Sequence, residues 1–273
     1  TSLTTIKALN EVAGKLGKIH NVIIMIELGE LREGVMRENL LDFYRNVFSL
    51  KHIKVIGIGT NLGCMYGIVP TYDKLLQLCL YKQLIEARFD VEIDLISGGS
   101  SITLPLITMK KLPKALNHFR IGEAAFLGTS PFDNRRFREL STKAFDFNAN
   151  IIELEHKETE PDGIVSDASI GHVDGDFEES GQANNDHSPT PMSCRAILDF
   201  GLLDVDTDGI SPKDSAVNYI GTTSDMTVVD VGTSRANGRI TSKYRIGDKV
   251  HFDLNYMAVA RLMSSKFIDK KVV

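Results

Sequence analysis

Two glycine-containing turns hold the residues whose types and spacing are best suited to chemistry. The first turn, at residues 97–101, reads SGGSS, follows an apolar run and precedes a predicted helix. Glycines let the backbone approach an anion, and the N–H groups and serine hydroxyls of such a turn can donate hydrogen bonds to phosphate. The simpler alternative is an ordinary turn with a helix-capping serine. The phosphate interpretation assigns ligand contacts to Ser100 and Ser101.

The second turn, Arg120-Ile121-Gly122, ends the next apolar run. An arginine at this position places a permanent cation over the edge of the predicted sheet. A ring nitrogen that faced this guanidinium would stay unprotonated because two cations repel, and an unprotonated ring is a weaker electron sink. The alternative is a structural arginine that pairs with Glu123 or Glu27, and the sequence leaves both open.

Two further polar segments follow predicted strands. Residues 26–34 read IELGELREG, with three acids and one base around two glycines, and a solvated charged loop is the usual structure of such a run. Residues 60–64 read TNLGC and contain Asn61 and Cys64. The thiol of Cys64 is a candidate acid–base group, although a lone cysteine is more often a small buried hydrophobe.

The elements that must position these residues alternate between helix-like and strand-like patterns. The apolar spacing predicts helices at 6–16, 37–48, 72–88 and 104–111, and strands at 22–26, 55–59, 91–96 and from 119. The continuous β-branched run at 22–26 is typical of a strand buried on both faces. This alternation at the length of βαβ units predicts a parallel α/β sheet or a portion of a barrel. The polar segments all follow strands, on the edge where parallel α/β folds bind ligands.

The second half of the chain has a different pattern. Short strands are predicted at 145–155, 196–200, 217–220, 226–231, 244–245 and 250–254, with turn signals between them, which favours an antiparallel β domain. Residues 158–191 are acidic and poor in apolar side chains, so they are predicted to form a long excursion. We therefore predict a cofactor-binding partial barrel at 1–137 and a β domain at 138–273.

Composition narrows the classes of function. The net charge of the 273 residues is −5 and no block of Lys or Arg stands out, which argues against a nucleic-acid partner. The cysteines Cys64, Cys79 and Cys194 lack the spacing of a disulfide framework or a metal site, which favours a reduced cytoplasmic setting. No apolar run is long enough to span a membrane, and no signal peptide is visible.

Taken in order, these segments resemble the alanine/ornithine racemase family of fold-type III enzymes that depend on pyridoxal 5'-phosphate. The resemblance covers nearly the whole chain and is weakest across 158–194. The motifs that carry it lie at 27–34, 57–64, 97–105, 117–128, 204–209, 223–225 and 254–256. The resemblance implies a fold of about the last four units of an alanine-racemase-like (β/α) barrel, followed by an antiparallel β domain.

The resemblance also implies how the cofactor would be held. Arg120 would face the pyridine nitrogen, and Asn61 would lie beside the ring. Ser101, together with the backbone N–H groups of Gly122 and Glu123, would hold the phosphate.

Three further residues receive implied roles. Arg32 would brace the oxygen side of the cofactor or the substrate. Tyr256 would reach the phosphate from the β domain. Asp225 would lie near the substrate entrance, across the interface of a homodimer, and the substrate would be a small amino acid.

The chain departs from the family pattern at the catalytic bases. The family's Schiff-base lysine comes from the first barrel strand, whereas residues 3–9 resemble the helix before the fifth strand, so this lysine is expected to lie outside the chain. No tyrosine stands at 201–204, where alanine racemases carry the opposite-face base. Glu27 stands where the family usually has Asp. Met226 stands where this subfamily tends to have His. The second base is therefore unassigned, with Cys64 and Tyr256 as candidates.

The favoured function is racemisation of an ornithine- or alanine-type amino acid, by removal and return of the Cα proton of an external aldimine on opposite faces. One alternative is a non-catalytic homologue that binds pyridoxal phosphate or another phosphorylated ligand. A second alternative is an amino-acid decarboxylase on the same scaffold. Half of a parallel barrel exposes strand edges and apolar surface, so we also predict that this chain is not an autonomous monomer.

Overall fold

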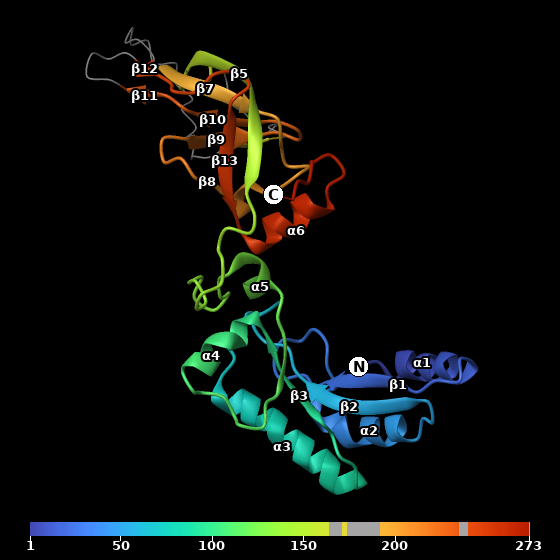
Figure 1. Ribbon diagram of the computed structural model, residues 1–273. Coiled ribbons are helices and arrows are strands. Elements are labelled where there is room, and N and C mark those ends of the chain that lie inside the picture. The colour runs from blue at the N-terminus through green and yellow to red at the C-terminus, as the bar shows by residue number, and fades with distance from the viewer. Residues whose placement is uncertain (164–170, 174–191, 235–239, 273) are drawn as a thin grey trace. The chain divides into compact units, whose positions relative to one another are not determined.

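The protein consists of two compact units, Thr1–Thr142 and Lys143–Val273, in a computed structural model that describes residues 1–163, 171–173, 192–234 and 240–272 (Figure 1). The predicted boundary after residue 137 falls short of this division after Thr142. Residues beyond 137 stay with the first unit because Arg136 Nε donates to the Leu140 carbonyl at 2.8 Å, and Phe137 N donates to Gly128 O at 2.8 Å. Most of the predicted excursion at 158–191 lies outside the described residues.

The first unit is built on a four-stranded sheet whose order, β1-β2-β3-β4, follows the chain. Its strands are β1 (His20–Met25), β2 (Ile53–Gly59), β3 (Leu95–Ser100) and β4 (His118–Arg120). Every neighbouring pair is parallel. This arrangement confirms the predicted parallel barrel portion. Within the described chain β1 and β4 each pair on one side only, and the oligomeric state stays a prediction.

Helices lie before, between and after the strands of this sheet. They are α1 (Leu3–Lys15), η1 (Arg37–Asn39), α2 (Leu40–Phe48), α3 (Tyr72–Phe89), η2 (Ser101–Thr103), α4 (Leu104–Thr108) and α5 (Glu123–Leu127). The longest helix, α3, begins where Thr71 Oγ1 accepts a hydrogen bond from Lys74 N, and it ends at Asp90, whose φ is 51°. A cap at the first turn and a left-handed residue at the end are local signals that define these boundaries.

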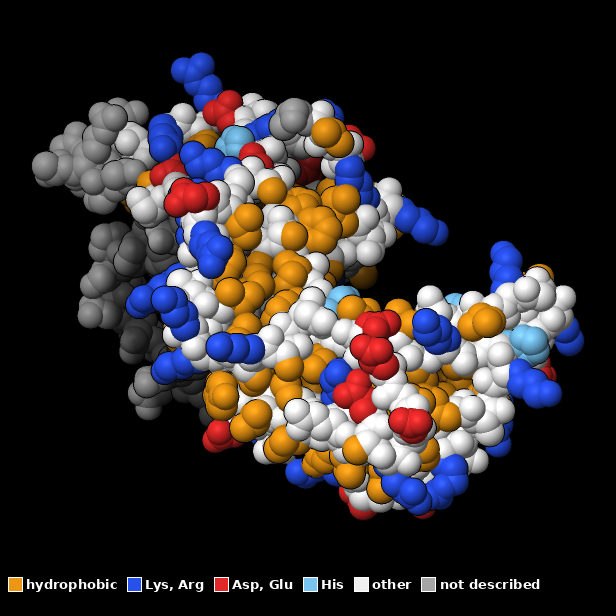
Figure 2. Space-filling model, turned by 60° about the horizontal axis from the view of Figure 1, so that its bottom comes forward, with side chains coloured by type: hydrophobic (Ala, Val, Ile, Leu, Met, Phe, Trp, Pro, Cys, Tyr) orange, Lys and Arg blue, Asp and Glu red, His pale blue; other side chains and the backbone are white. Residues whose placement is uncertain are grey.

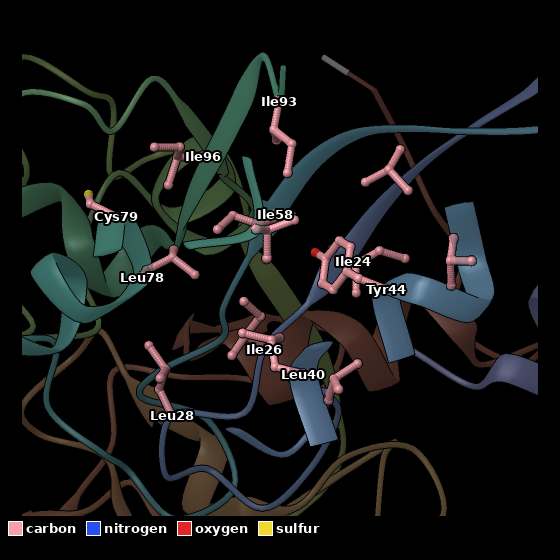
Figure 3. Packing of buried hydrophobic residues seen from close by; sticks show 14 of the residues in the cluster. Ile24, Ile26, Leu28, Leu40, Tyr44, Ile58, Leu78, Cys79, Ile93 and Ile96 are labelled. Carbon is pink, nitrogen blue, oxygen red and sulfur yellow. The ribbon is translucent and has the colours of Figure 1, made fainter. Parts of the chain in front are cut away.

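The core of the first unit lies between the sheet and its helices (Figure 3). Ile24 of β1, Ile26 just after β1 and Ile58 of β2 belong to this cluster, together with Tyr44 of α2 and Leu78 of α3. Full burial of one such aliphatic side chain stabilises a fold by roughly 1.5–3 kcal/mol. The expectation of a strand at 22–26 buried on both faces is wrong in part, because several of its side chains are only half-buried. Half-buried Ile23 and Met25 alternate with buried Ile24 and Ile26, so one face of β1 is covered and the other only in part.

One strand lies further along the chain than predicted. β3 begins at Leu95 instead of 91, and it continues through both glycines of the SGGSS segment. Residues before it are held in a loop because Ile93 N donates to Glu86 Oε1 at 2.8 Å, and Asn117 Nδ2 donates to the Asp94 carbonyl at 2.8 Å. The predicted turn is therefore the end of a strand followed directly by η2.

The second unit is an antiparallel β domain, as predicted. Its seven-stranded sheet has the order β6-β9-β10-β7-β5-β13-β8, and the described pairs are antiparallel. The strands are β5 (Phe147–Glu158), β6 (His172–Val173), β7 (Met192–Leu198), β8 (Ile210–Pro212), β9 (Asn218–Thr222), β10 (Thr227–Asp230) and β13 (Lys249–Leu254). A two-stranded sheet pairs β11 (Thr233–Ser234) with β12 (Ile240–Thr241). The remaining elements are η3 (Thr207–Gly209) and α6 (Tyr256–Ser264).

Two features of this unit differ from the predicted elements. Residues 244–245 are irregular instead of a strand and precede a turn at 246–247, across which Arg245 N donates to Asp248 Oδ2 at 2.8 Å. The helix α6 has no counterpart among the predicted elements, although its signal is local. Asn255 Oδ1 accepts a hydrogen bond from Ala258 N at 2.9 Å, which is a typical helix N-cap.

On the face shown in Figure 2, basic and acidic side chains are interspersed, with apolar side chains between them. Every helix in the described ranges is too short or too polar to span a lipid bilayer. Within the same ranges, no three His, Cys, Asp or Glu side chains gather in a group that a metal ion could use.

We predict that Asp214 makes the second unit sensitive to acid. Lys243 Nζ lies 2.7 Å from its carboxylate, and Tyr244 OH donates to it at 2.5 Å. These contacts, led by Lys243, lower the pKa of Asp214 to about 2 from its ordinary value of 3.8. A carboxyl whose pKa is lowered by folding stabilises the fold above its unfolded pKa and loses this contribution as the pH falls through the folded value.

Asp214→Asn is therefore expected to lower the free energy of unfolding near neutral pH by on the order of 2 kcal/mol. It should also flatten the pH dependence of stability between about pH 4 and pH 2. Urea unfolding at several pH values measures both effects, with exposed Asp208→Asn as the control. Parallel pH profiles for Asp214→Asn and the wild type would contradict the prediction.

Candidate active site

The carboxyl edge of the parallel sheet brings most of the predicted site residues together. Arg120, the last residue of β4, donates from Nη2 to Asn61 Oδ1 at 3.1 Å and to the Thr60 carbonyl at 3.3 Å. Asn61 is buried and lies just beyond the end of β2. Because the strands are parallel, their carboxyl ends meet at one edge, and residues far apart in sequence become neighbours there.

The carboxylate partner of Arg120 is Glu33. Arg120 Nη1 lies 3.9 Å from Glu33 Oε1, whereas the sequence suggested Glu27 or Glu123. Glu27 is buried and accepts hydrogen bonds within its own loop, from Gly29 N at 2.5 Å and Arg32 N at 3.3 Å. Glu27 is therefore engaged with the backbone of its own loop, and Glu33 is the acid that joins the arginine.

A second arginine shares this carboxylate. Arg32 donates from Nη2 to Glu33 Oε1 at 2.8 Å, and its Nη1 lies 2.6 Å from Cys64 Sγ. The hydrogen bond from Arg32 lowers the pKa of Glu33, and the same contact raises the pKa of Arg32. Cys64, Arg32, Glu33, Arg120 and Asn61 thus form one chain of contacts with two cations and one anion.

The structure settles two alternatives that the sequence left open. Residues 27–34 are solvated only in part, since Glu27 is 6% exposed and Glu30 is 1% exposed, whereas Leu31 is 61% exposed. Cys64 is not a buried hydrophobe, because it is exposed and in contact with Arg32. Sequence reasoning missed Glu30, Glu33 and Thr60 as site residues. The two acids lie inside the charged segment that the sequence identified, so the signal was present but not specific.

The SGGSS segment and the RIG segment meet at Ser101. Ser101 is buried, and its Oγ accepts hydrogen bonds from Gly122 N at 3.3 Å and Ala124 N at 3.1 Å. A serine hydroxyl has two acceptor positions and one O–H donor, so these contacts leave the O–H to donate elsewhere. Ser100 pairs with Arg120 in the register of β3 and β4. The bond from Ala124 N was not expected from the sequence, and the phosphate contact expected of Glu123 N stays a prediction.

The residues at this edge fit a phosphate-bearing cofactor. A side chain at Gly122 would meet nothing within 4 Å, so open space lies beside the Gly122 Cα. The buried Thr60 Oγ1 has no hydrogen-bond partner among the described residues, which leaves a polar group for a ligand. Burial raises the pKa of Glu123, so this carboxyl is less inclined to carry a negative charge near an anion. These groups could hold pyridoxal phosphate with Arg120 near its ring.

Two predicted residues, Tyr256 and Asp225, belong to the second unit, and their roles stay predictions. Tyr256 is the first residue of α6 and is 44% exposed. Asp225 is exposed in the turn between β9 and β10, where its Oδ1 accepts a hydrogen bond from Ser224 Oγ at 3.1 Å. Met226, which follows it, is also exposed.

The chain is thus an α/β protein with a cluster of polar residues at the carboxyl edge of its parallel sheet and an antiparallel β domain after it. Residues 1–131 match the family model described as alanine racemase, N-terminal domain. An ornithine racemase of Acetoanaerobium sticklandii is 31% identical over the whole chain, which covers 73% of that protein. A lysine racemase of Thermotoga maritima is 30% identical over 97% of the chain, which covers 69% of that protein.

A solved structure supports the same grouping at the level of the fold. The alanine racemase of Corynebacterium glutamicum superposes with a TM-score of 0.57 and 18% identity, over 90% of this chain and 59% of that one. The chain therefore spans less than two thirds of that solved enzyme. It belongs to the alanine racemase-like family.

Proposed function

We propose that the protein with this chain is a pyridoxal-phosphate-dependent racemase of an amino acid of the ornithine or alanine type. The observation that carries the proposal is Arg120, held between Asn61 and Glu33 at the carboxyl edge that also carries the Ser101 hydroxyl. The curated relatives are described as ornithine racemase and lysine racemase, which supports a basic amino acid as the substrate. In this proposal the enzyme acts as a homodimer in a reduced cytoplasm.

The residues of the chain have separate tasks in this proposal. Pyridoxal phosphate, when bound, supplies the electron sink that acidifies the Cα–H of an amino acid. The Ser101 O–H and the Glu123 N–H bind its phosphate, while the Gly122 N–H donates to Ser101 Oγ and orients that hydroxyl. The Arg120 guanidinium keeps a proton off the ring nitrogen because two cations repel. Arg32 binds the substrate carboxylate or the oxygen side of the cofactor.

Proton transfer at Cα requires an acid–base group on each face. Cys64 is the candidate in the first unit because its thiol is exposed beside Arg32. Tyr256 is the candidate in the second unit. The contacts with cofactor and substrate depend on neither Cys64 nor Tyr256. The acid–base roles can therefore be tested separately from those contacts.

The function is tested by incubating the purified protein with pyridoxal phosphate and, in turn, L-ornithine, L-lysine and L-alanine. Chiral chromatography measures the opposite enantiomer, and released carbon dioxide is measured in parallel. We expect the D-enantiomer to form without carbon dioxide. Carbon dioxide in proportion to substrate loss would establish the decarboxylase alternative instead.

The cofactor is tested in the same samples. Borohydride reduction followed by intact mass and peptide mapping would locate a pyridoxyl group and the lysine that holds it. Cofactor binding without any enantiomer formation would favour the non-catalytic homologue. Absence of both a cofactor absorption band and enantiomer formation would refute the proposal.

A further inference from the structure

Glu30 is a buried carboxylate whose hydrogen bonds come from the backbone of another loop. It is 1% exposed, and it accepts hydrogen bonds from the N–H groups of Cys64 at 3.1 Å, Tyr66 at 3.0 Å and Ile68 at 2.8 Å. Burial alone would raise the pKa of Glu30, but the backbone hydrogen bonds from Tyr66, Cys64 and Ile68 outweigh it, and the net pKa is lowered. The carboxylate is therefore stable as a charged acceptor in this position.

The loop that Glu30 holds has no regular secondary structure of its own. Residues 60–71 between β2 and α3 contain neither helix nor strand, and Gly63 and Gly67 have φ values of 65° and 66°. Backbone N–H groups in such a segment need acceptors from elsewhere. One carboxylate supplies acceptors to three of them, so it fixes this loop against the loop after β1.

The loop that carries Glu30 is itself held in place. Lys74 Nζ of α3 donates to the Leu28 carbonyl at 2.6 Å. A side chain at Gly34, where φ is 149°, would overlap Glu27 N, so the loop folds tightly back on its own start. Glu30 therefore has a rigid base from which to position Cys64.

The contact that depends on this arrangement is the one between Cys64 and Arg32. Cys64 is exposed and the Arg32 side chain is 42% exposed, yet Cys64 Sγ and Arg32 Nη1 lie 2.6 Å apart. Exposed pairs of this kind gain little free energy, because ordering the two side chains opposes the attraction. The pair is maintained only when both loops are already ordered.

We propose that Glu30 is a positioning residue, which holds the loop after β2 so that the Cys64 thiol lies against the Arg32 guanidinium. Glu30 itself touches no substrate or cofactor atom in this proposal. Its meaning for catalysis rests on the proposed function, which places Cys64 and Arg32 at the substrate. The geometric claim does not depend on that function.

The experiment measures the rate at which iodoacetamide alkylates Cys64 in the protein without added cofactor. The Arg32 guanidinium contacts the sulfur of Cys64, and cationic surroundings make a cysteine more reactive toward an alkylating reagent. Arg32→Ala is therefore expected to slow alkylation roughly fivefold, on the scale of a partly exposed charge pair. Glu30→Gln should slow it by a similar factor, because the thiol is no longer held against the cation. The exposed carboxyl of Glu38 provides the matched control, Glu38→Gln.

The double variant decides whether Glu30 acts through this contact. If it does, Arg32→Ala combined with Glu30→Gln is no slower than Arg32→Ala alone. Peptide mapping separates Cys64 from Cys79 and Cys194, which are buried. A wild-type rate for Glu30→Gln, or a double variant slowed by the product of the single effects, would overturn the proposal.

Two further points keep the outcome independent of folding and of the proposed function. If Glu30→Gln does not fold, the same cycle is run with Glu30→Asp, whose shorter side chain cannot reach all three N–H groups. Alkylation requires neither cofactor nor substrate. A protein that shows the predicted non-additivity but racemises no amino acid would therefore retain the positioning role and lose the proposed function.

Discussion

Arg120→Ala is expected to lower kcat/KM for racemisation by roughly 100-fold or more, the scale seen when one preorganised charged or hydrogen-bonding group is removed from an active site. The guanidinium links Asn61 after β2 to Glu33 of the loop after β1. Its loss removes the permanent cation beside the proposed cofactor ring. Because the side chain is 41% exposed, truncation should leave the free energy of unfolding nearly unchanged.

The measurement is kcat/KM by chiral chromatography, together with the absorbance of bound cofactor and a urea unfolding curve. Exposed Arg88→Ala at the end of α3 is the matched control. Arg120→Lys keeps the charge, but an ammonium group lacks the planar fork that reaches both partners, so an intermediate loss of activity is expected. Activity of Arg120→Ala close to that of the wild type would show that the guanidinium has no such role.

Ser101→Ala is expected to destabilise the ligand-free protein by about 2–4 kcal/mol, because it leaves two backbone N–H groups without an acceptor. These groups belong to Gly122 and Ala124, and Ser101 itself is 2% exposed. In the presence of pyridoxal phosphate the loss should be smaller, since phosphate oxygens can accept from the freed N–H groups.

Urea unfolding with and without pyridoxal phosphate measures both effects. Exposed Ser215→Ala is the control, because Ser215 lies outside the predicted phosphate contacts. Its cost should stay within about 0.5 kcal/mol, as is usual for a substitution that removes no buried contact. Equal costs for the two serine variants would contradict the phosphate cradle. An undiminished cost of Ser101→Ala with pyridoxal phosphate present would do the same.

Local sequence patterns were sufficient to predict the parallel α/β unit, the antiparallel β domain and the edge at which the site residues meet. Apolar periodicity depends on local sequence, and the carboxyl ends of parallel strands share one edge whatever the details of packing. That is why Arg120, Asn61 and Ser101 could be grouped from the sequence alone. The same reasoning misplaced the start of β3, because contacts from Glu86 and Asn117 to the loop before it are not visible in local sequence.

The separate roles of the acids in residues 27–34 depend on tertiary contacts instead. Glu27, Glu30 and Glu33 have the same chemistry and even spacing, yet one binds its own loop, one binds the loop after β2 and one joins two arginines. The difference arises from left-handed or unusual backbone conformations in this loop, including φ of 50° at Leu31. Such conformations are set by packing against neighbouring loops, so no local pattern in the sequence could assign the three roles.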